Sequence, residues 1–281
     1  MQELQNALDE IELPEEHHFR YPLGHTTRLS NFLKILESKH LTPQKCKILE
    51  KDVLYCTYGA IHYIAKGEPN NLLQRPVGMI LNSEIVCMVD EYYPLDTGMV
   101  KSGKEYDNPR WKQSLLRIMP KTKLIGLQCS INSCDVKSCH INLCKLIYTL
   151  YGSHSNYMAA KCSSSFKFKE KDLNILQSCL MEMVNVSGVD NRGRTIECHL
   201  EREVALLRYL ECIILPEEHQ TEFYEFLKPF KNDYNNWPKV LTYDSTEIFH
   251  PDECAIVVKK MALEYIKETY LSRYQLLTRK E

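Results

Sequence analysis

Three short segments of this 281-residue chain carry side chains suited to holding a ligand, and the first is His25-Thr26-Thr27. A neutral imidazole beside a hydroxyl offers both a hydrogen-bond donor and an acceptor, which suits a ligand that carries hydroxyl groups. The segment precedes a helical pattern at residues 29–36, where apolar residues recur every three or four positions. Either His25 binds a ligand, or it only satisfies its hydrogen bonds at the start of that helix.

The second segment holds two tyrosines, Tyr55 and Tyr58, in a predicted strand over residues 53–58. The face of an aromatic ring attracts a planar cation through cation–π and dispersion forces. Spacing alone does not choose between the two rings, and ordinary packing inside a sheet is the alternative for each of them.

The third segment contains an acid, Glu197, within a predicted strand over residues 195–200 that follows a turn at residues 190–193. A charged residue inside a strand is disfavoured unless it faces water or a pocket. Alternation places Glu197 on the same face as His199, and it predicts one wet face for this strand. Glu201 and Glu203 are alternatives, although their position after Leu200 is typical of a solvated strand end.

Residues 25–36, HTTRLSNFLKIL, followed by His40-Leu41-Thr42, resemble the first motif of the ADP-ribosyltransferases, in particular their DarT-like and RNA phosphotransferase-like branches. The resemblance covers residues 21–215 and implies an ADP-ribosyltransferase-like split β-sandwich with flanking helices, an α+β fold. It also implies NAD as the substrate, with site residues spread over all three segments and one further arginine. These are His25, Thr26 and Thr27 at the adenosine ribose, Tyr55 or Tyr58 at the nicotinamide, Arg75 at the pyrophosphate or the target, and Glu197 as the catalytic acid.

The acceptor implied by this resemblance is a nucleic acid base, with RNA favoured over DNA, in a bacterial toxin or phage-defence protein that an antitoxin protein would control. A basic stretch at residues 101–123 agrees, with seven Lys or Arg against two acids. Residues 161–171 are a second candidate, with Phe166 and Phe168 among lysines. An ordinary solvated face is the alternative for both stretches.

A different class of function is suggested by four cysteines that recur every five residues, Cys129, Cys134, Cys139 and Cys144, with His140 adjacent. The alternative interpretation is a non-catalytic, zinc-containing protein that binds nucleic acid. Structural zinc sites usually place ligands in closely spaced pairs, which this run lacks, so free thiols are favoured and no metal is expected. An NAD-using RNA 2′-phosphotransferase is a third hypothesis, but its arginine-rich site is not found in the sequence.

The bulk composition predicts a folded protein, because 44% of the residues are hydrophobic and 26% are charged. A net charge of −2 provides no global attraction to nucleic acid or to an anionic membrane. The sequence contains no run of about 18 apolar residues, so it predicts no membrane-spanning helix. Twelve cysteines without a secretory signal indicate thiols in the cytoplasm.

The remaining pattern predicts one α+β domain over residues 1–281. Further strands are expected at residues 75–81, 85–89 and 210–215. Two helices are expected between residues 136 and 160, and a long amphipathic helix over about 252–280.

Overall fold

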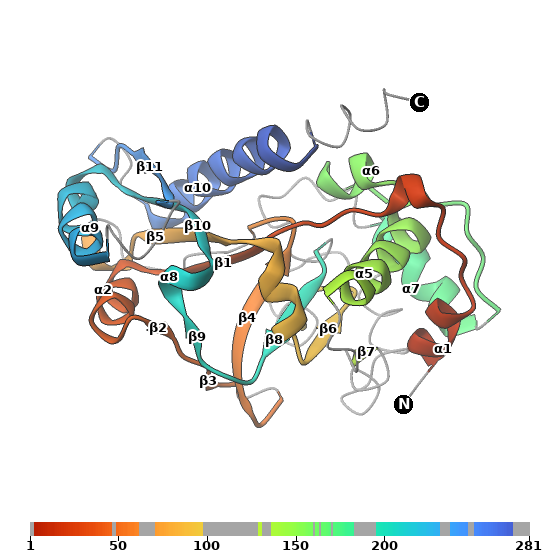
Figure 1. The fold of residues 1–281 in the computed structure, drawn as a ribbon. Helices are drawn as coiled ribbons and strands as arrows, with labels where there is room; N and C mark the ends of the chain where they lie inside the picture. The colour runs from red at the N-terminus through yellow and green to blue at the C-terminus, as the bar shows by residue number, and fades with distance from the viewer. Residues whose placement is uncertain are drawn as a thin grey trace.

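The fold is taken from a computed structural model, which describes residues 3–46, 49–61, 71–97, 129–130, 136–159, 161–162, 164–169, 171–182, 195–230, 237–246 and 250–271. Within these ranges the chain forms one large β-sheet with helices packed around it (Figure 1). The predicted α+β class is therefore confirmed.

Among the described residues, the large sheet has nine strands. Their spatial order is β11 (Lys239–Tyr243), β10 (Leu210–Pro216), β5 (Pro76–Leu81), β1 (Leu23–Arg28), β4 (Asp52–Tyr58), β8 (Glu197–Leu200), β6 (Glu91–Tyr93) and β7 (Cys129–Ser130), with β3 (Gln44–Lys45) paired to β4. The β10–β11 pair is parallel, and the other pairs are antiparallel. A small second sheet joins β2 (His40–Leu41) to β9 (Val204–Ala205).

The large sheet splits between β1 and β4. Strand β1 pairs with β5 along all six of its residues, but with β4 only at Leu23↔Tyr58 and Gly24↔Thr57. Beyond Gly24 the two strands diverge, and in Figure 1 β5 and β10 run across the view whereas β4 and β8 run steeply down it. A Cβ atom on Gly24 would lie 1.9 Å from the carbonyl oxygen of Ala60, so only glycine fits at the point of divergence.

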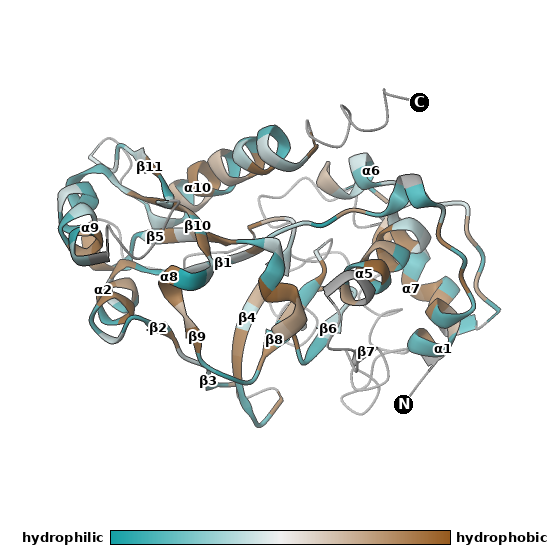
Figure 2. Ribbon diagram, viewed as in Figure 1, coloured by the Kyte–Doolittle hydropathy of each residue, from teal (hydrophilic) through white to brown (hydrophobic). Residues whose placement is uncertain are grey.

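Helices cover both parts of the sheet. Helix α10 (Pro251–Ile266) packs on β5, β10 and β11, and Val258 approaches the backbone of β5 at Gly78, where a Cβ would lie 2.7 Å from it. Hydrophobic and hydrophilic residues alternate along α10, as expected of a helix with one buried face (Figure 2). A continuous cluster of buried apolar side chains extends from Leu4 to Ile266 and forms the core.

Further helices connect the strands and flank the sheet. The α-helices among them are α1 (Glu3–Asp9), α2 (Leu29–Ser38), α5 (Val136–Tyr151), α6 (His154–Met158), α7 (Lys171–Glu182), α8 (Leu206–Tyr209) and α9 (Gln220–Leu227). The 3-10 helices are η1 (Glu15–His17), η2 (Leu72–Gln74), η3 (Ser83–Met88), η7 (Glu217–His219) and η8 (Lys228–Phe230), and η9 (Lys267–Leu271) is a π-helical extension of α10.

Most of the predicted elements are present, as α2, β4, β5, β10 and the pair α5 and α6. The strand predicted at residues 85–89 is wrong, because the Asn82 side chain accepts a hydrogen bond from the Glu84 N–H (3.1 Å) and caps the 3-10 helix η3. The wet face predicted for residues 195–200 is also wrong, since all four residues of β8 are buried. The predicted turn at residues 190–193 and the end of the C-terminal helix beyond residue 271 lie outside the described residues.

Candidate functional site

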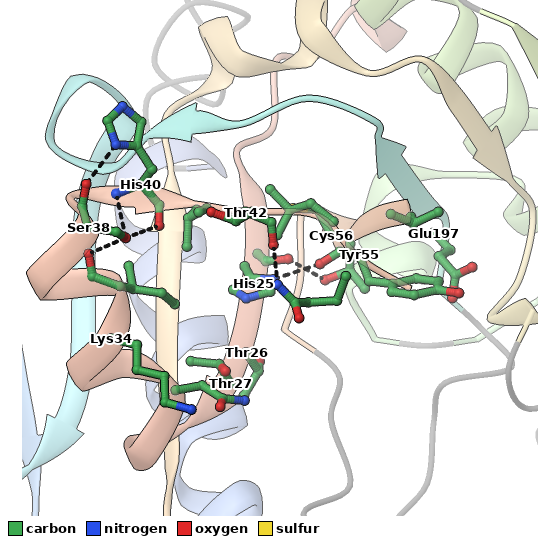
Figure 3. Close-up of a pocket in the computed structure, with 18 of the residues that line it drawn as sticks. His25, Thr26, Thr27, Lys34, Ser38, His40, Thr42, Tyr55, Cys56 and Glu197 are labelled. Atoms are coloured by element: carbon green, nitrogen blue, oxygen red, sulfur yellow. Dashed lines mark hydrogen bonds between the residues drawn. The ribbon is translucent and has the colours of Figure 1, made fainter. Parts of the chain in front are cut away.

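A pocket of about 760 Å³ lies at the split between β1 and β4. Strands β1 and β4 and helix α2 form most of its wall, and residues 40–42 and 44 of the β2–β3 segment, Asp96 and Glu197 complete it. Figure 3 shows Thr26, Thr27 and Lys34 gathered on one side, Tyr55 and Glu197 on the other, and His25 between them. The volume is in the range typical of pockets for drug-sized ligands and cofactors.

His25 bridges the two diverging strands with its side chain. Its Nδ1 donates a hydrogen bond to the backbone carbonyl of Tyr55 (2.7 Å), just beyond the last paired residues of β1 and β4. Burial lowers the pKa of His25, and the bond to the Tyr55 carbonyl opposes this shift. A carbonyl only accepts hydrogen bonds, so in the neutral ring Nδ1 carries the proton and Nε2 is left as the acceptor for a ligand hydroxyl.

Tyr55 forms part of the opposite wall. Its hydroxyl donates to Cys46 Sγ (2.5 Å), and its ring meets the His199 ring edge-on, with centroids 4.9 Å apart. Burial, followed by the bond to Cys46, raises the pKa of Tyr55, so the phenol is neutral. The ring is therefore held by a contact at its tip and a contact at its edge.

Tyr58 does not line the pocket, in contrast to the prediction that allowed it there. It lies three residues after Tyr55 in β4, and residues an odd number apart in a strand point to opposite faces of the sheet. The side chain is fully buried, and its hydroxyl accepts from the Tyr21 N–H (3.3 Å) and bonds to His140 Nδ1 (2.7 Å). Tyr58 is thus a core residue that fastens β4 to α5.

Arg75 is also separated from the pocket. It is buried before β5, where Nη1 donates to Cys254 Sγ of α10 (3.2 Å) and the carbonyl accepts from the Leu29 N–H (2.8 Å). Arg75 therefore does not line the pocket, where a contact with the pyrophosphate or the target was expected. An ammonium group does line the pocket, and it belongs to Lys34 of α2.

Glu197 is the acid of β8 that reaches the pocket, and it is only 5% exposed. Its Oε1 atom accepts hydrogen bonds from Thr97 Oγ1 (2.7 Å) and His199 Nε2 (2.6 Å), and Oε2 accepts from the Thr97 N–H (3.3 Å). Three donors thus compensate the burial of a negative charge. His199 lies on the same face of β8, as the alternation predicted.

Neither of the two alternative acids lines the pocket. Glu201 pairs with Lys51, whose ammonium also contacts Glu91 (2.5 Å). Glu203 is exposed at the surface and accepts from Thr42 Oγ1 (3.3 Å). Of the three acids that the sequence left open, Glu197 is the one placed to meet a ligand.

Four side chains of the site received no role in the sequence analysis. Lys34 follows Asn31 and precedes Ser38 on α2, a spacing of three and four that forms a polar stripe along the pocket and was a readable signal. Asp96 and Thr97 come from the segment after β6, far from Glu197 in sequence, and no local pattern connects them. His199 was placed on the correct face, but its contact with Glu197 was not foreseen.

The basic stretch at residues 101–123 lies outside the described residues. In the second stretch, Phe168 is 6% exposed and belongs to the hydrophobic core, packed edge-on against Phe166 with centroids 5.0 Å apart. Lys169 forms a surface ion pair with Glu10 (2.5 Å). Phe168 is therefore not available to stack on a nucleic acid base.

The cysteine run does not assemble as a cluster in the part of the chain that can be described. Cys139 and Cys144 are buried on α5. Both ring nitrogens of His140 are engaged, Nε2 with the Ser83 carbonyl (2.9 Å) and Nδ1 with Tyr58, and burial lowers the pKa of His140 to about 4. Cys134 lies outside the described residues, within which no three His, Cys, Asp or Glu side chains are placed to hold a metal ion.

No protein-family model matches the chain. No curated protein matches it significantly either. Among the helices that can be described, none combines the length and the hydropathy needed to cross a membrane.

Proposed function

We propose that this protein is an ADP-ribosyltransferase, which cleaves NAD and transfers ADP-ribose to a macromolecular acceptor. One observation carries the proposal: five of the seven side chains expected at the NAD site line a single pocket, although they come from three distant segments of the chain. These are His25, Thr26, Thr27, Tyr55 and Glu197. The split of the sheet at this pocket supports the split β-sandwich that the resemblance implies.

The distribution of charge in the pocket suits NAD. Lys34 lies beside Thr26 and Thr27 on one side, and Glu197 lies beside Tyr55 on the other (Figure 3). NAD is anionic at its two phosphates and cationic at its nicotinamide ring. The phosphates would therefore bind near Lys34, and the nicotinamide and its ribose near Tyr55 and Glu197.

The reaction breaks the bond between C1′ of the nicotinamide ribose and the ring nitrogen. The bonding electrons leave with neutral nicotinamide, and positive charge develops on the ribose. Glu197 would accept a hydrogen bond from a hydroxyl of this ribose and stabilise that charge, which is the role of a carboxylate in glycosidic cleavage. The acceptor then attacks C1′ and loses a proton. Because Glu197 is buried, the electrostatic contacts of its carboxylate are stronger than they would be in water.

A nucleic acid base, with RNA favoured, is the acceptor that we propose. Its support is the DarT-like resemblance of residues 25–36 and the basic composition of residues 101–123. A cytoplasmic toxin or phage-defence protein held in check by an antitoxin is the setting that follows from the same resemblance.

The test is to incubate the protein with NAD labelled in its adenosine moiety and with separate pools of RNA, DNA and protein. Nicotinamide release and transfer of the label to a nucleic acid pool are the expected results. Transfer of the label to the protein pool alone would refute a nucleic acid as the acceptor, but the proposed transferase activity would stand. A protein that neither binds NAD saturably nor releases nicotinamide with any pool would refute the proposal as a whole.

A further inference from the structure

The hydrogen bonds of the Glu197 carboxylate are distributed unequally between its two oxygens. Each carboxylate oxygen offers about two lone-pair positions. Both positions of Oε1 are occupied, by Thr97 Oγ1 (2.7 Å) and His199 Nε2 (2.6 Å), whereas Oε2 accepts only the longer bond from the Thr97 N–H (3.3 Å) among the described groups. Oε2 is therefore the oxygen with capacity left for a ligand hydroxyl.

The imidazole that fills Oε1 is itself held rigidly. His199 has no exposed surface, and its ring lies between Tyr55 and Tyr93, with both ring centroids 4.9 Å from its own. Its Nε2 carries a proton, because a carboxylate oxygen only accepts. On the other side, Nδ1 lies 3.9 Å from Glu91 Oε2, which is beyond hydrogen-bond distance.

Glu91 is engaged by other groups. Its Oε1 pairs with Lys51 (2.5 Å), and its Oε2 accepts from the Tyr93 hydroxyl (3.4 Å). The only short bond of His199 to a side chain in the described region is consequently the one to Glu197. An imidazole fixed by two aromatic rings keeps that donor at a constant position.

We propose that His199 is a positioning residue for Glu197: its Nε2–H, together with the Thr97 hydroxyl, saturates Oε1 and so presents Oε2 to the substrate hydroxyl. The inference rests on the proposed function of the pocket. In the competing structural role, His199 would only fill space between two tyrosines, and any side chain of similar size would serve.

Two substitutions separate these roles. His199→Gln keeps a nitrogen donor at similar reach, whereas His199→Leu keeps an apolar filling and removes the donor. We expect His199→Leu to lower kcat for NAD cleavage by about tenfold to a hundredfold, the effect of losing a hydrogen bond to a charged group, and to change KM by less than about threefold. His199→Gln should stay within about threefold of the wild-type kcat.

The matched control is Cys198→Ala. Cys198 is the preceding residue of β8, is equally buried, and by alternation lies on the opposite face of the strand; it does not line the pocket. This change should lower the melting temperature without lowering kcat. A wild-type kcat for His199→Leu, or an equal loss in the Leu and Gln variants, would overturn the positioning role.

A second measurement does not depend on NAD. In protein labelled with ¹⁵N-histidine, the His199 signals are identified by their loss in His199→Gln, and Nε2 should be the protonated nitrogen. Glu197→Gln removes the charge 2.6 Å away and should shift the Nε2 signal. If the wild-type protein proves unable to cleave NAD, the proposed function fails, and this spectrum still decides whether His199 is coupled to Glu197: unchanged signals would overturn the inference.

Discussion

Glu197→Gln tests the proposed chemistry most directly, because it changes one functional atom and almost no volume. The amide oxygen can take the place of Oε1 and accept from Thr97 Oγ1 and His199 Nε2. The amide nitrogen then takes the place of Oε2, where the bond from the Thr97 N–H is already long at 3.3 Å. The expected loss of unfolding free energy is about 1 kcal/mol, the contribution of one ordinary hydrogen bond.

The effect on activity should be much larger. The variant loses the negative charge that faces the developing positive charge of the ribose, and it presents a donor where the substrate hydroxyl also donates. Removal of one such transition-state contact typically lowers kcat by about 10²–10³-fold, which corresponds to about 2.7–4 kcal/mol. The assay is nicotinamide release at saturating NAD, with thermal melting measured on the same samples.

Glu203→Gln is the matched control, because it makes the same chemical change on an exposed residue outside the pocket. It should retain wild-type activity. The reasoning is refuted if folded Glu197→Gln keeps a tenth or more of the wild-type kcat. An inactive Glu203→Gln beside an active Glu197→Gln would transfer the catalytic role to the end of the strand.

Three further predictions concern other parts of the molecule. His25→Ala should weaken NAD binding, measured by calorimetry, more than it lowers the melting temperature; a large melting shift with unchanged affinity would show that His25 is structural. Burial lowers the pKa of His140 and of His154 to about 4, from an ordinary value of about 6.5, so the unfolded chain binds protons that the folded chain does not. The unfolding free energy should therefore fall by up to about 3 kcal/mol per histidine as the pH drops from about 6.5 to 4, and a flat profile in urea titrations would contradict this. Neutralising three basic residues of the stretch at 101–123 should slow the modification of a nucleic acid and leave NAD hydrolysis unchanged. The difference in transfer rate between the variant and the wild type should shrink as the salt concentration rises. Equal transfer rates for both proteins at low salt would exclude this stretch as the surface that binds the acceptor. The three basic residues are Lys112, Arg117 and Lys121.

The position of Glu197 in the pocket was predictable because the signal is local. An acid inside an alternating apolar strand needs a polar surrounding, and the strand period is enough to orient it. Whether that surrounding was water or a pocket was not predictable from β8 alone. The face that was expected to be wet is buried, and Thr97 and His199 donate hydrogen bonds to the carboxylate.

The choice between Tyr55 and Tyr58 depended on information absent from their own segment. Alternation separates the two rings onto opposite faces, but it does not say which face meets the pocket. That is decided by α5, which brings His140 to the Tyr58 hydroxyl from 82 positions further along the chain. Arg75 is a similar case, because its partner, Cys254, lies on the last α-helix of the described chain.

Short elements were the least predictable part of the fold. Strands β2, β3 and β9 have two residues each, which is too few to show a period, and distant segments specify their pairing. The segment at residues 85–89 has the composition of a strand, and one capping side chain, Asn82, makes it helical instead.

The order of strands in the large sheet also restricts when a pocket can exist during folding. Strand β8 lies in the interior, between β4 and β6, although both neighbours are made more than a hundred residues earlier. During synthesis on the ribosome, β1 and β4 can emerge and pair before residues 197–200 are made, and the edge of β4 that pairs with β8 stays open until then. Such non-local pairing is slow, and partly formed sheets expose strand edges that favour aggregation. A nascent or truncated chain that ends before β8 therefore carries His25 and Tyr55 but lacks Glu197, so the pocket stays incomplete until β8 joins the sheet.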